Sequence, residues 1–146
     1  MKEIERKWIV PLTKTVEKIL IKNGGVEIKD HYFNQKCRLR YYGDKWFITI
    51  KSSGTLVRDE YEFEIKEPLN LDISPWLIKK RVQYEYKKQV FDLNLFKDIK
   101  INGVELITAE IELSSAKEKI SIPKFFSTEV TKDKRFYGYN LFKLLK

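Results

Sequence analysis

The chain has 146 residues, of which 42% are hydrophobic and 34% are charged, and its formal net charge is +8. A chain of this length and composition buries a core, so a disordered protein is excluded and a single domain over residues 1–146 is expected. It contains no apolar run near the roughly 20 residues of a transmembrane helix, no secretory signal, and one cysteine, Cys37, which excludes an intrachain disulfide. These features predict a cytoplasmic protein without a membrane partner.

The positive net charge favours an anionic partner, such as a nucleic acid or a small polyanion, although solvated surface lysines alone would also produce it. His31 is the only histidine and Cys37 the only cysteine. A zinc site built from three or four such ligands is therefore nearly excluded. Any metal ion would have to be a hard cation held by carboxylates.

The first predicted element is a strand at the very start of the chain. Alternate residues of a strand share a face, so Glu3, Glu5 and Lys7 are expected to point to one side. Arg6 is out of phase with them and is expected on the opposite side. A helix is predicted over residues 13–23, because an apolar stripe there is followed by Gly24, a sensible C-terminal stop.

Most of the remaining predicted elements are strands joined by tight turns. Alternation predicts strands over residues 37–41, 46–51, 57–65, 91–96 and 106–113, and a strand and hairpin region over 79–90. Turn signals occur at residues 43–44, 52–54 and 102–103. Short helices are predicted over residues 71–77, 115–119 and 139–145. Because strands outnumber helices, we expect a mainly β, α+β fold with an antiparallel sheet.

The charged faces of these strands are segregated by sign. Arg38 and Arg40 share a face, as do Glu60 and Glu62, and such neighbours repel unless a counter-ion lies between them. Arginine is concentrated at these alternating positions, and its planar guanidinium matches phosphate oxygens. A closed barrel explains both patterns if the charged faces turn inward and the apolar faces turn outward beneath the helices. Such a lumen suits a complex of a divalent cation with a polyphosphate.

The order of the paired charges resembles the CYTH superfamily, also called the triphosphate tunnel metalloenzymes. The opening Glu3-Ile4-Glu5-Arg6-Lys7 is similar to that family's E-x-E-x-K, and the resemblance extends over essentially the whole chain. Tyr32 is similar to a tyrosine that plugs one tunnel mouth in some members, whereas Gly138 stands where asparagine is expected. The other matching motifs lie at residues 38–40 (R-x-R), 49–51 (T-x-K), 58–62 (R-x-E-x-E), 79–81 (K-x-R), 110–112 (E-x-E) and 129–135 (E-V-T-x-D-x-R).

The resemblance implies a closed eight-stranded antiparallel β-barrel, a triphosphate tunnel with a charged lumen and flanking helices. It also implies divalent-metal-dependent hydrolysis of a triphosphate, with inorganic tripolyphosphate favoured and Mg²⁺ or Mn²⁺ as cofactor. The implied catalytic residues are Lys79, Glu60 and Glu62, with Lys79 a candidate base if its pKa is lowered. The implied phosphate-binding residues are Lys7, Arg38, Arg40, Lys51, Arg58, Lys79 and Arg81. The implied metal ligands are Glu3, Glu5, Glu60, Glu62, Glu110 and Glu112.

Several alternatives stay open at this point. Other members of the superfamily hydrolyse thiamine triphosphate or ATP, or cyclise ATP to cAMP, and the choice depends on how the substrate lies in the tunnel. A non-catalytic binder of polyphosphate or RNA would use the same basic rows, with the glutamates as structural counter-charges. Nucleic acid is the less favoured partner. A homodimer is compatible with the resemblance, because dimers are common among such proteins.

Overall fold

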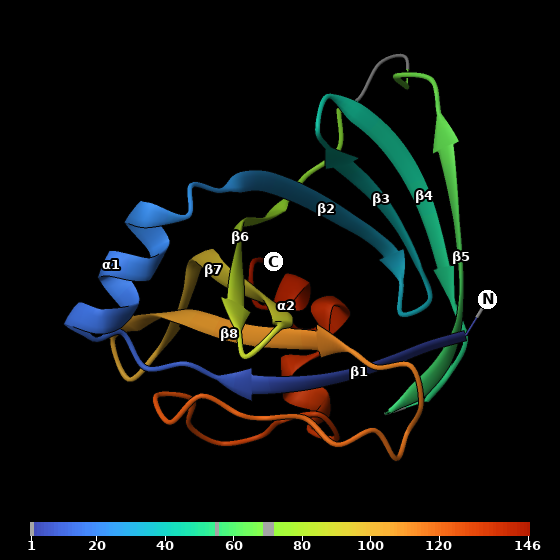
Figure 1. Cartoon of the computed structure of the whole chain (residues 1–146). Helices are drawn as coiled ribbons and strands as arrows, with labels where there is room; N and C mark the ends of the chain where they lie inside the picture. Colours follow the sequence, from blue (N-terminus) through green and yellow to red (C-terminus); the bar gives the residue numbers. More distant parts are fainter. Residues whose placement is uncertain (1, 55, 69–71) are drawn as a thin grey trace.

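In the computed structural model, eight antiparallel strands close into a barrel (Figure 1). The structure describes residues 2–54, 56–68 and 72–146. The elements in chain order are β1 (Lys2–Ile9), α1 (Lys14–Lys22), β2 (Val26–Asn34), β3 (Cys37–Tyr42), β4 (Lys45–Lys51), β5 (Val57–Ile65), β6 (Leu77–Tyr86), β7 (Gln89–Ile101), β8 (Val104–Glu112), η1 (Lys134–Phe136) and α2 (Gly138–Lys143). Around the barrel the strands follow the order β1-β5-β4-β3-β2-β6-β7-β8, so β1 pairs with both β5 and β8.

Two-residue turns with left-handed backbone conformation connect several of the hairpins. Asn102 and Gly103 join β7 to β8 with φ values of 51° and 79°. Positive φ at both central residues gives these turns the twist that a hairpin needs, and it confirms the predicted turn at 102–103. Lys87 and Lys88 join β6 to β7 in the same conformation, at φ values of 50° and 61°. This pair lacks the glycine that marks most such turns. The sequence therefore predicted a hairpin region over 79–90 but did not show which residues form its turn.

The apolar outer face of the barrel is covered over β1, β6, β7 and β8. Val16 and Leu20 of α1 are buried there, in the same core cluster as Phe91 of β7. The irregular segment 113–133 extends the cover, since Phe126 packs on Trp8 of β1 with ring centroids 5.7 Å apart. The expectation that helices cover the outer face is therefore only partly right. On the outer face of β5, by contrast, Tyr61 and Phe63 remain 53% and 54% exposed.

The C-terminal helix α2 closes one end of the barrel instead of covering its outside. In Figure 1 it lies in the middle of the ring of strands. Leu141 and Phe142 of α2 are buried in a second core cluster with Leu77 of β6, Phe96 of β7 and Phe136 of η1. The predicted terminal helix over 139–145 is thus present, although it begins at Gly138 and ends at Lys143. None of the helices described here is long and apolar enough to cross a membrane.

The short helix predicted over residues 71–77 is wrong. Leu71 lies outside the described residues, residues 72–76 are irregular, and Leu77 already belongs to β6. Pro75 explains the difference, because proline lacks an amide hydrogen and disfavours helical conformation in the residue before it.

The helix predicted over residues 115–119 is also wrong. The segment forms a single turn, in which the Glu118 amide donates to the Ser115 carbonyl at 3.2 Å. The Glu118 carboxylate accepts from the Ser114 amide at 2.7 Å. A run of five residues offers little more than one turn, which is too short to propagate a helix.

Candidate active site

The barrel encloses a cavity of about 720 Å³ with a strongly charged lining. Nine lysines and arginines and eight aspartates and glutamates line it, so the two signs nearly balance. Most of the excess positive charge of the chain therefore lies outside the cavity. The structure brings every predicted site residue into this lining: Glu3, Glu5, Lys7, Tyr32, Arg38, Arg40, Lys51, Arg58, Glu60, Glu62, Lys79, Arg81, Glu110 and Glu112.

The inward direction of these side chains follows from strand alternation. Glu3, Glu5 and Lys7 of β1 face the cavity, whereas Arg6 points outward and donates to Glu129 at 2.6 and 2.9 Å. On β5, the exposed Glu64 pairs with Lys45 at 3.5 Å and does not line the main cavity. The two-residue period of the strand therefore determines which charges meet in the lumen.

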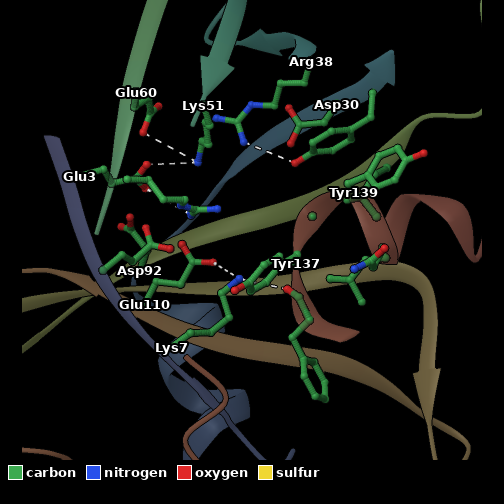
Figure 2. Close-up of a pocket in the computed structure, with 18 of the residues that line it drawn as sticks. Glu3, Lys7, Asp30, Arg38, Lys51, Glu60, Asp92, Glu110, Tyr137 and Tyr139 are labelled. Carbon is green, nitrogen blue, oxygen red and sulfur yellow. Dashed lines mark hydrogen bonds and ion pairs between the residues drawn. The ribbon is translucent and has the colours of Figure 1, made fainter. Parts of the chain in front are cut away.

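Carboxylates gather where β8, β1 and β5 lie side by side, and we call Glu3, Glu5, Glu60 and Glu110 the acidic wall. Lys51 Nζ lies 3.3 Å from Glu3 Oε2 and 3.8 Å from Glu60 Oε2 (Figure 2). Lys7 Nζ lies 3.4 Å from Glu110 Oε1. The lysines of β4 and β1 thus partly neutralise this wall.

The carboxyl groups of the acidic wall affect one another's ionisation. Burial and the neighbouring Glu110 carboxylate raise the pKa of Glu5 to about 8. Burial and a hydrogen bond shared with Glu3 raise the pKa of Glu60 to about 7. Burial acts in the same direction on Glu3, but the Glu60 hydrogen bond and the Lys51 and Arg58 charges lower its pKa to about 2. Without a cation between them, Glu5 and Glu60 therefore retain protons near neutral pH.

Cations gather on β3 and β6, and we call Arg38, Arg40, Lys79 and Arg81 the basic wall. Arg40 is fixed by two hydrogen bonds to Asp30 of β2, at 2.7 and 2.9 Å. Arg81 donates to Asn94 Oδ1 of β7 at 3.0 Å and lies 3.9 Å from Glu110 Oε2 of β8. Planar guanidinium groups held in this way present fixed donors to an anion.

Lys79 differs from its neighbours in the basic wall. Its side chain is buried, and its Nζ lies 5.5 Å from the ring centroid of Phe96. Burial, together with the positive charges of Arg81 and Arg40, holds the pKa of the Lys79 ammonium well below its usual value. This position favours a neutral amine, which can accept a proton.

The donor set of the acidic wall fits a hard divalent cation. It consists of carboxylate oxygens, and two pairs of these groups, Glu3 with Glu60 and Glu5 with Glu110, already repel or share a proton. Over the parts of the chain that are described, no three His, Cys, Asp or Glu side chains are grouped to hold one ion. Mg²⁺ commonly takes one or two carboxylates and completes its shell with water and substrate phosphate. The pairs therefore suit an ion that binds together with a phosphate ligand.

The remaining predicted residues lie at the edges of the cavity. The Thr49 hydroxyl donates to Glu62 at 2.8 Å, and Glu62 lies 4.0 Å from Arg38. Glu112 is exposed at the end of β8. Tyr32 receives a long hydrogen bond from Arg38 Nη1 at 3.5 Å and packs on α2 through Phe142, with ring centroids 5.6 Å apart.

Sequence reasoning missed Asp30 as a site residue. Asp30 is 1% exposed and carries the buried ion pair with Arg40. No strand was predicted over residues 26–34. Asp30 and Tyr32 are two residues apart and would share one face of a strand, so the prediction that Tyr32 faces the tunnel could also have placed Asp30 there. Asp92 also lines the cavity, 3.7 Å from Arg81. His31 faces away and packs among Phe33, Trp76 and Phe142.

The chain is similar to proteins of known fold and name. The family model described as the CYTH domain matches residues 1–137. An inorganic triphosphatase of Nitrosomonas europaea is 31% identical over 147 residues, which cover 93% of each chain. A solved structure of an inorganic triphosphatase is 25% identical, with a TM-score of 0.62, covering 96% of this chain and 93% of that one.

A more distant structure shares the fold. A putative adenylate cyclase from Bacillus halodurans is 19% identical, with a TM-score of 0.50, and the match covers 78% of this chain and 82% of that one. The family match spans most of the chain, and the closed barrel holds the paired charges in its lumen. The chain therefore belongs to the CYTH family.

Proposed function

We propose that this protein hydrolyses inorganic tripolyphosphate to diphosphate and phosphate with Mg²⁺ or Mn²⁺. The observation that carries the proposal is one enclosed cavity in which an acidic wall and a basic wall face each other. One wall suits a divalent cation and the other suits a chain of phosphates. A relative that is 31% identical is named an inorganic triphosphatase, and CYTH triphosphatases depend on a metal in general.

The cationic side chains bind and orient the phosphate chain. Arg40 presents a guanidinium already fixed by Asp30, and Arg81 presents one fixed by Asn94. Groups oriented before the substrate arrives lose little freedom on binding, so they hold the reacting phosphorus in a defined place. Further phosphate oxygens are bound by Lys7, Arg38, Lys51 and Arg58.

The carboxylates of the acidic wall, in the pairs Glu3 with Glu60 and Glu5 with Glu110, would hold a divalent ion together with substrate phosphate. Glu62 and Glu112, at the edge of the cavity, would assist in holding it. A divalent ion bound there neutralises charge on the phosphate oxygens and favours ionisation of water.

Lys79 acts as the base in hydrolysis. Its lowered pKa leaves the amine free to take a proton from the attacking water. The water oxygen bonds to the terminal phosphorus, the bridging oxygen leaves with the bonding electron pair, and diphosphate remains on the basic wall. Arg38, Arg40 and Arg81 stabilise the charge that develops on the leaving group.

The test is phosphate release from tripolyphosphate with Mg²⁺ or Mn²⁺, compared with the same assay in EDTA. Glu60→Gln removes a proposed ligand and should lower kcat/KM by about 100-fold or more. Glu64→Gln is the matched control on the same strand, because Glu64 is exposed and pairs only with Lys45 among the described residues. Full turnover by Glu60→Gln, or equal turnover in EDTA, would contradict the metal assignment.

Parallel assays with ATP and thiamine triphosphate identify the substrate. A higher kcat/KM for either one would replace tripolyphosphate in the proposal. If no triphosphate is hydrolysed and RNA binds through Arg38, the protein is a binder and not an enzyme.

A further inference from the structure

We propose that the Tyr137 hydroxyl contacts the substrate and donates a hydrogen bond to a phosphate oxygen of bound tripolyphosphate. The inference deepens the proposed function and rests on it for the identity of the ligand. Tyr137 lies outside the paired charge motifs of the strands and comes from the segment that closes the tunnel. It would add a neutral donor to a site otherwise built from charged groups.

Local structure places Tyr137 at the end of the tunnel. Asp133 caps η1 by accepting from the Arg135 amide at 3.1 Å, and Phe136 anchors the turn in the second core cluster. The Tyr137 amide donates to the Lys134 carbonyl at 3.1 Å. Tyr137 is thus fixed between η1 and α2, and its side chain joins the cavity lining beside Lys7 (Figure 2).

The next residue, Gly138, allows this segment to approach Tyr32 closely. A Cβ atom at position 138 would overlap the Tyr32 hydroxyl oxygen. Tyr32 packs in turn on Tyr139, with ring centroids 6.0 Å apart. This contact explains why glycine stands here in place of a larger residue, and it sets the position from which Tyr137 enters the lumen.

The Tyr137 hydroxyl is buried and has no hydrogen-bond partner among the described residues. Two cations flank the residue, however. The Arg58 guanidinium lies 5.8 Å from the centroid of its ring, and Lys7 Nζ donates to the carbonyl of the preceding residue, Phe136, at 3.1 Å. Lysine and arginine only donate hydrogen bonds.

A phosphate oxygen supplies an acceptor for this hydroxyl. Lys7 and Arg58 attract the anion to the position beside the ring, and the phenol then donates to one of its oxygens. A hydrogen bond to an ionised acceptor is stronger than one between neutral groups. A buried hydroxyl without a partner is also unfavourable. Binding therefore satisfies a group that the free protein leaves unsatisfied.

The test compares Tyr137→Phe with the wild type and with Tyr61→Phe, which removes a phenol hydroxyl from the exposed outer face of β5. Tripolyphosphate binding is measured by calorimetry in EDTA, where turnover is absent, and kcat/KM is measured with Mg²⁺. Tyr137→Phe should weaken binding and lower kcat/KM by about tenfold each. Its midpoint of thermal unfolding should be unchanged or higher, because an unsatisfied hydroxyl is removed. Tyr61→Phe should match the wild type.

The outcomes separate this inference from the proposed function. Wild-type affinity and kcat/KM in Tyr137→Phe would overturn it. A lower unfolding midpoint with unchanged affinity would also overturn it, because the hydroxyl would then have a structural partner. If the wild type binds tripolyphosphate but releases no phosphate, the proposed hydrolysis fails, and the calorimetric comparison still decides the role of Tyr137.

Discussion

Both walls of the tunnel bring side chains of like charge close together, but the repulsion is reduced in a different way on each wall. On the acidic wall, Glu5 and Glu60 retain protons, with pKa values raised to about 8 and about 7 by burial and by their carboxyl neighbours. On the basic wall, burial and the positive charges of Arg81 and Arg40 lower the pKa of Lys79. Asp30 relieves part of the remaining repulsion by pairing with Arg40.

The difference shows that each wall is complementary to one part of a metal–phosphate complex. A divalent ion would replace protons on the acidic wall, and phosphate oxygens would balance the arginines of the basic wall. Lys51 and Lys7 contact the acidic wall directly and moderate its charge. The tunnel lining thus holds nearly equal numbers of cationic and anionic side chains, concentrated on different walls, which favours a ligand carrying both signs.

The largest expected effect comes from Lys79, the lysine of the basic wall whose pKa is lowered. Lys79→Met should lower kcat for tripolyphosphate by roughly 10²–10⁴-fold, the usual contribution of a positioned base. Because the neutral amine is the active form, wild-type kcat should fall as the pH drops below the lowered pKa of Lys79. That acidic limb should be absent from the pH profile of the variant.

Two further variants sharpen this prediction. Lys79→Arg places a permanently charged group on the basic wall and removes the base, so its kcat should stay low. Lys80→Gln changes the neighbouring residue, which is exposed and out of phase with the lumen, and should behave as the wild type. High turnover by Lys79→Arg would show that charge alone is required at this position.

The next largest effect concerns the carboxylate that compensates the basic wall. Asp30→Asn leaves Arg40 without its buried counter-charge and should destabilise the protein by about 3 kcal/mol. For a chain of this size the midpoint of thermal unfolding should fall by about 10 °C. Asp133→Asn is the control: it removes an ion pair with the exposed Arg135 and should leave the midpoint of thermal unfolding nearly unchanged.

The pH dependence gives the Asp30 prediction its sign. Burial opposes ionisation of Asp30, but Arg40 and Arg38 hold its pKa below the usual value. The stability that this pair contributes is therefore present above the unfolded pKa of about 4, and it is lost as the pH falls further, through the folded value. The Asn variant should lack this acid-side loss. A wild-type midpoint for Asp30→Asn would show that Arg40 needs no partner.

The sequence predicted the barrel and its lumen better than it predicted what surrounds them. Glu3, Arg38 and Glu110 were placed by a two-residue period that depends only on backbone geometry. The turn at Lys87 and Lys88 was not predicted, because lysine seldom adopts positive φ, whereas this hairpin requires positive φ at both residues. The helices over 71–77 and 115–119 were wrong because such short runs offer too few helical hydrogen bonds, and Pro75 also interrupts the first of them.

Contacts between distant segments were beyond reach from the sequence. The Asp30–Arg40 pair depends on β2 lying beside β3. The position of the Tyr137 hydroxyl depends on the segment between η1 and α2 reaching the end of the barrel. The phase of Asp30 with Tyr32 indicates which way Asp30 faces, but no sequence pattern identifies Arg40 as its partner. The departure at Gly138 was visible in the sequence, but only the position of the Tyr32 hydroxyl explains it.

The smallest expected effect tests the acidic wall through its protons. Glu5 and Glu60 have folded pKa values of about 8 and about 7, above the unfolded value of about 4.3. Without metal, their contribution to stability is therefore present below pH 4 and is lost progressively as the pH rises towards 8. A divalent ion binds the ionised groups and offsets this loss. The rise in unfolding midpoint caused by Mg²⁺ should thus be a few degrees larger at pH 8 than at pH 6. In Glu5→Gln that pH dependence should shrink, and an equal rise at both values in the wild type would place the ion away from this wall.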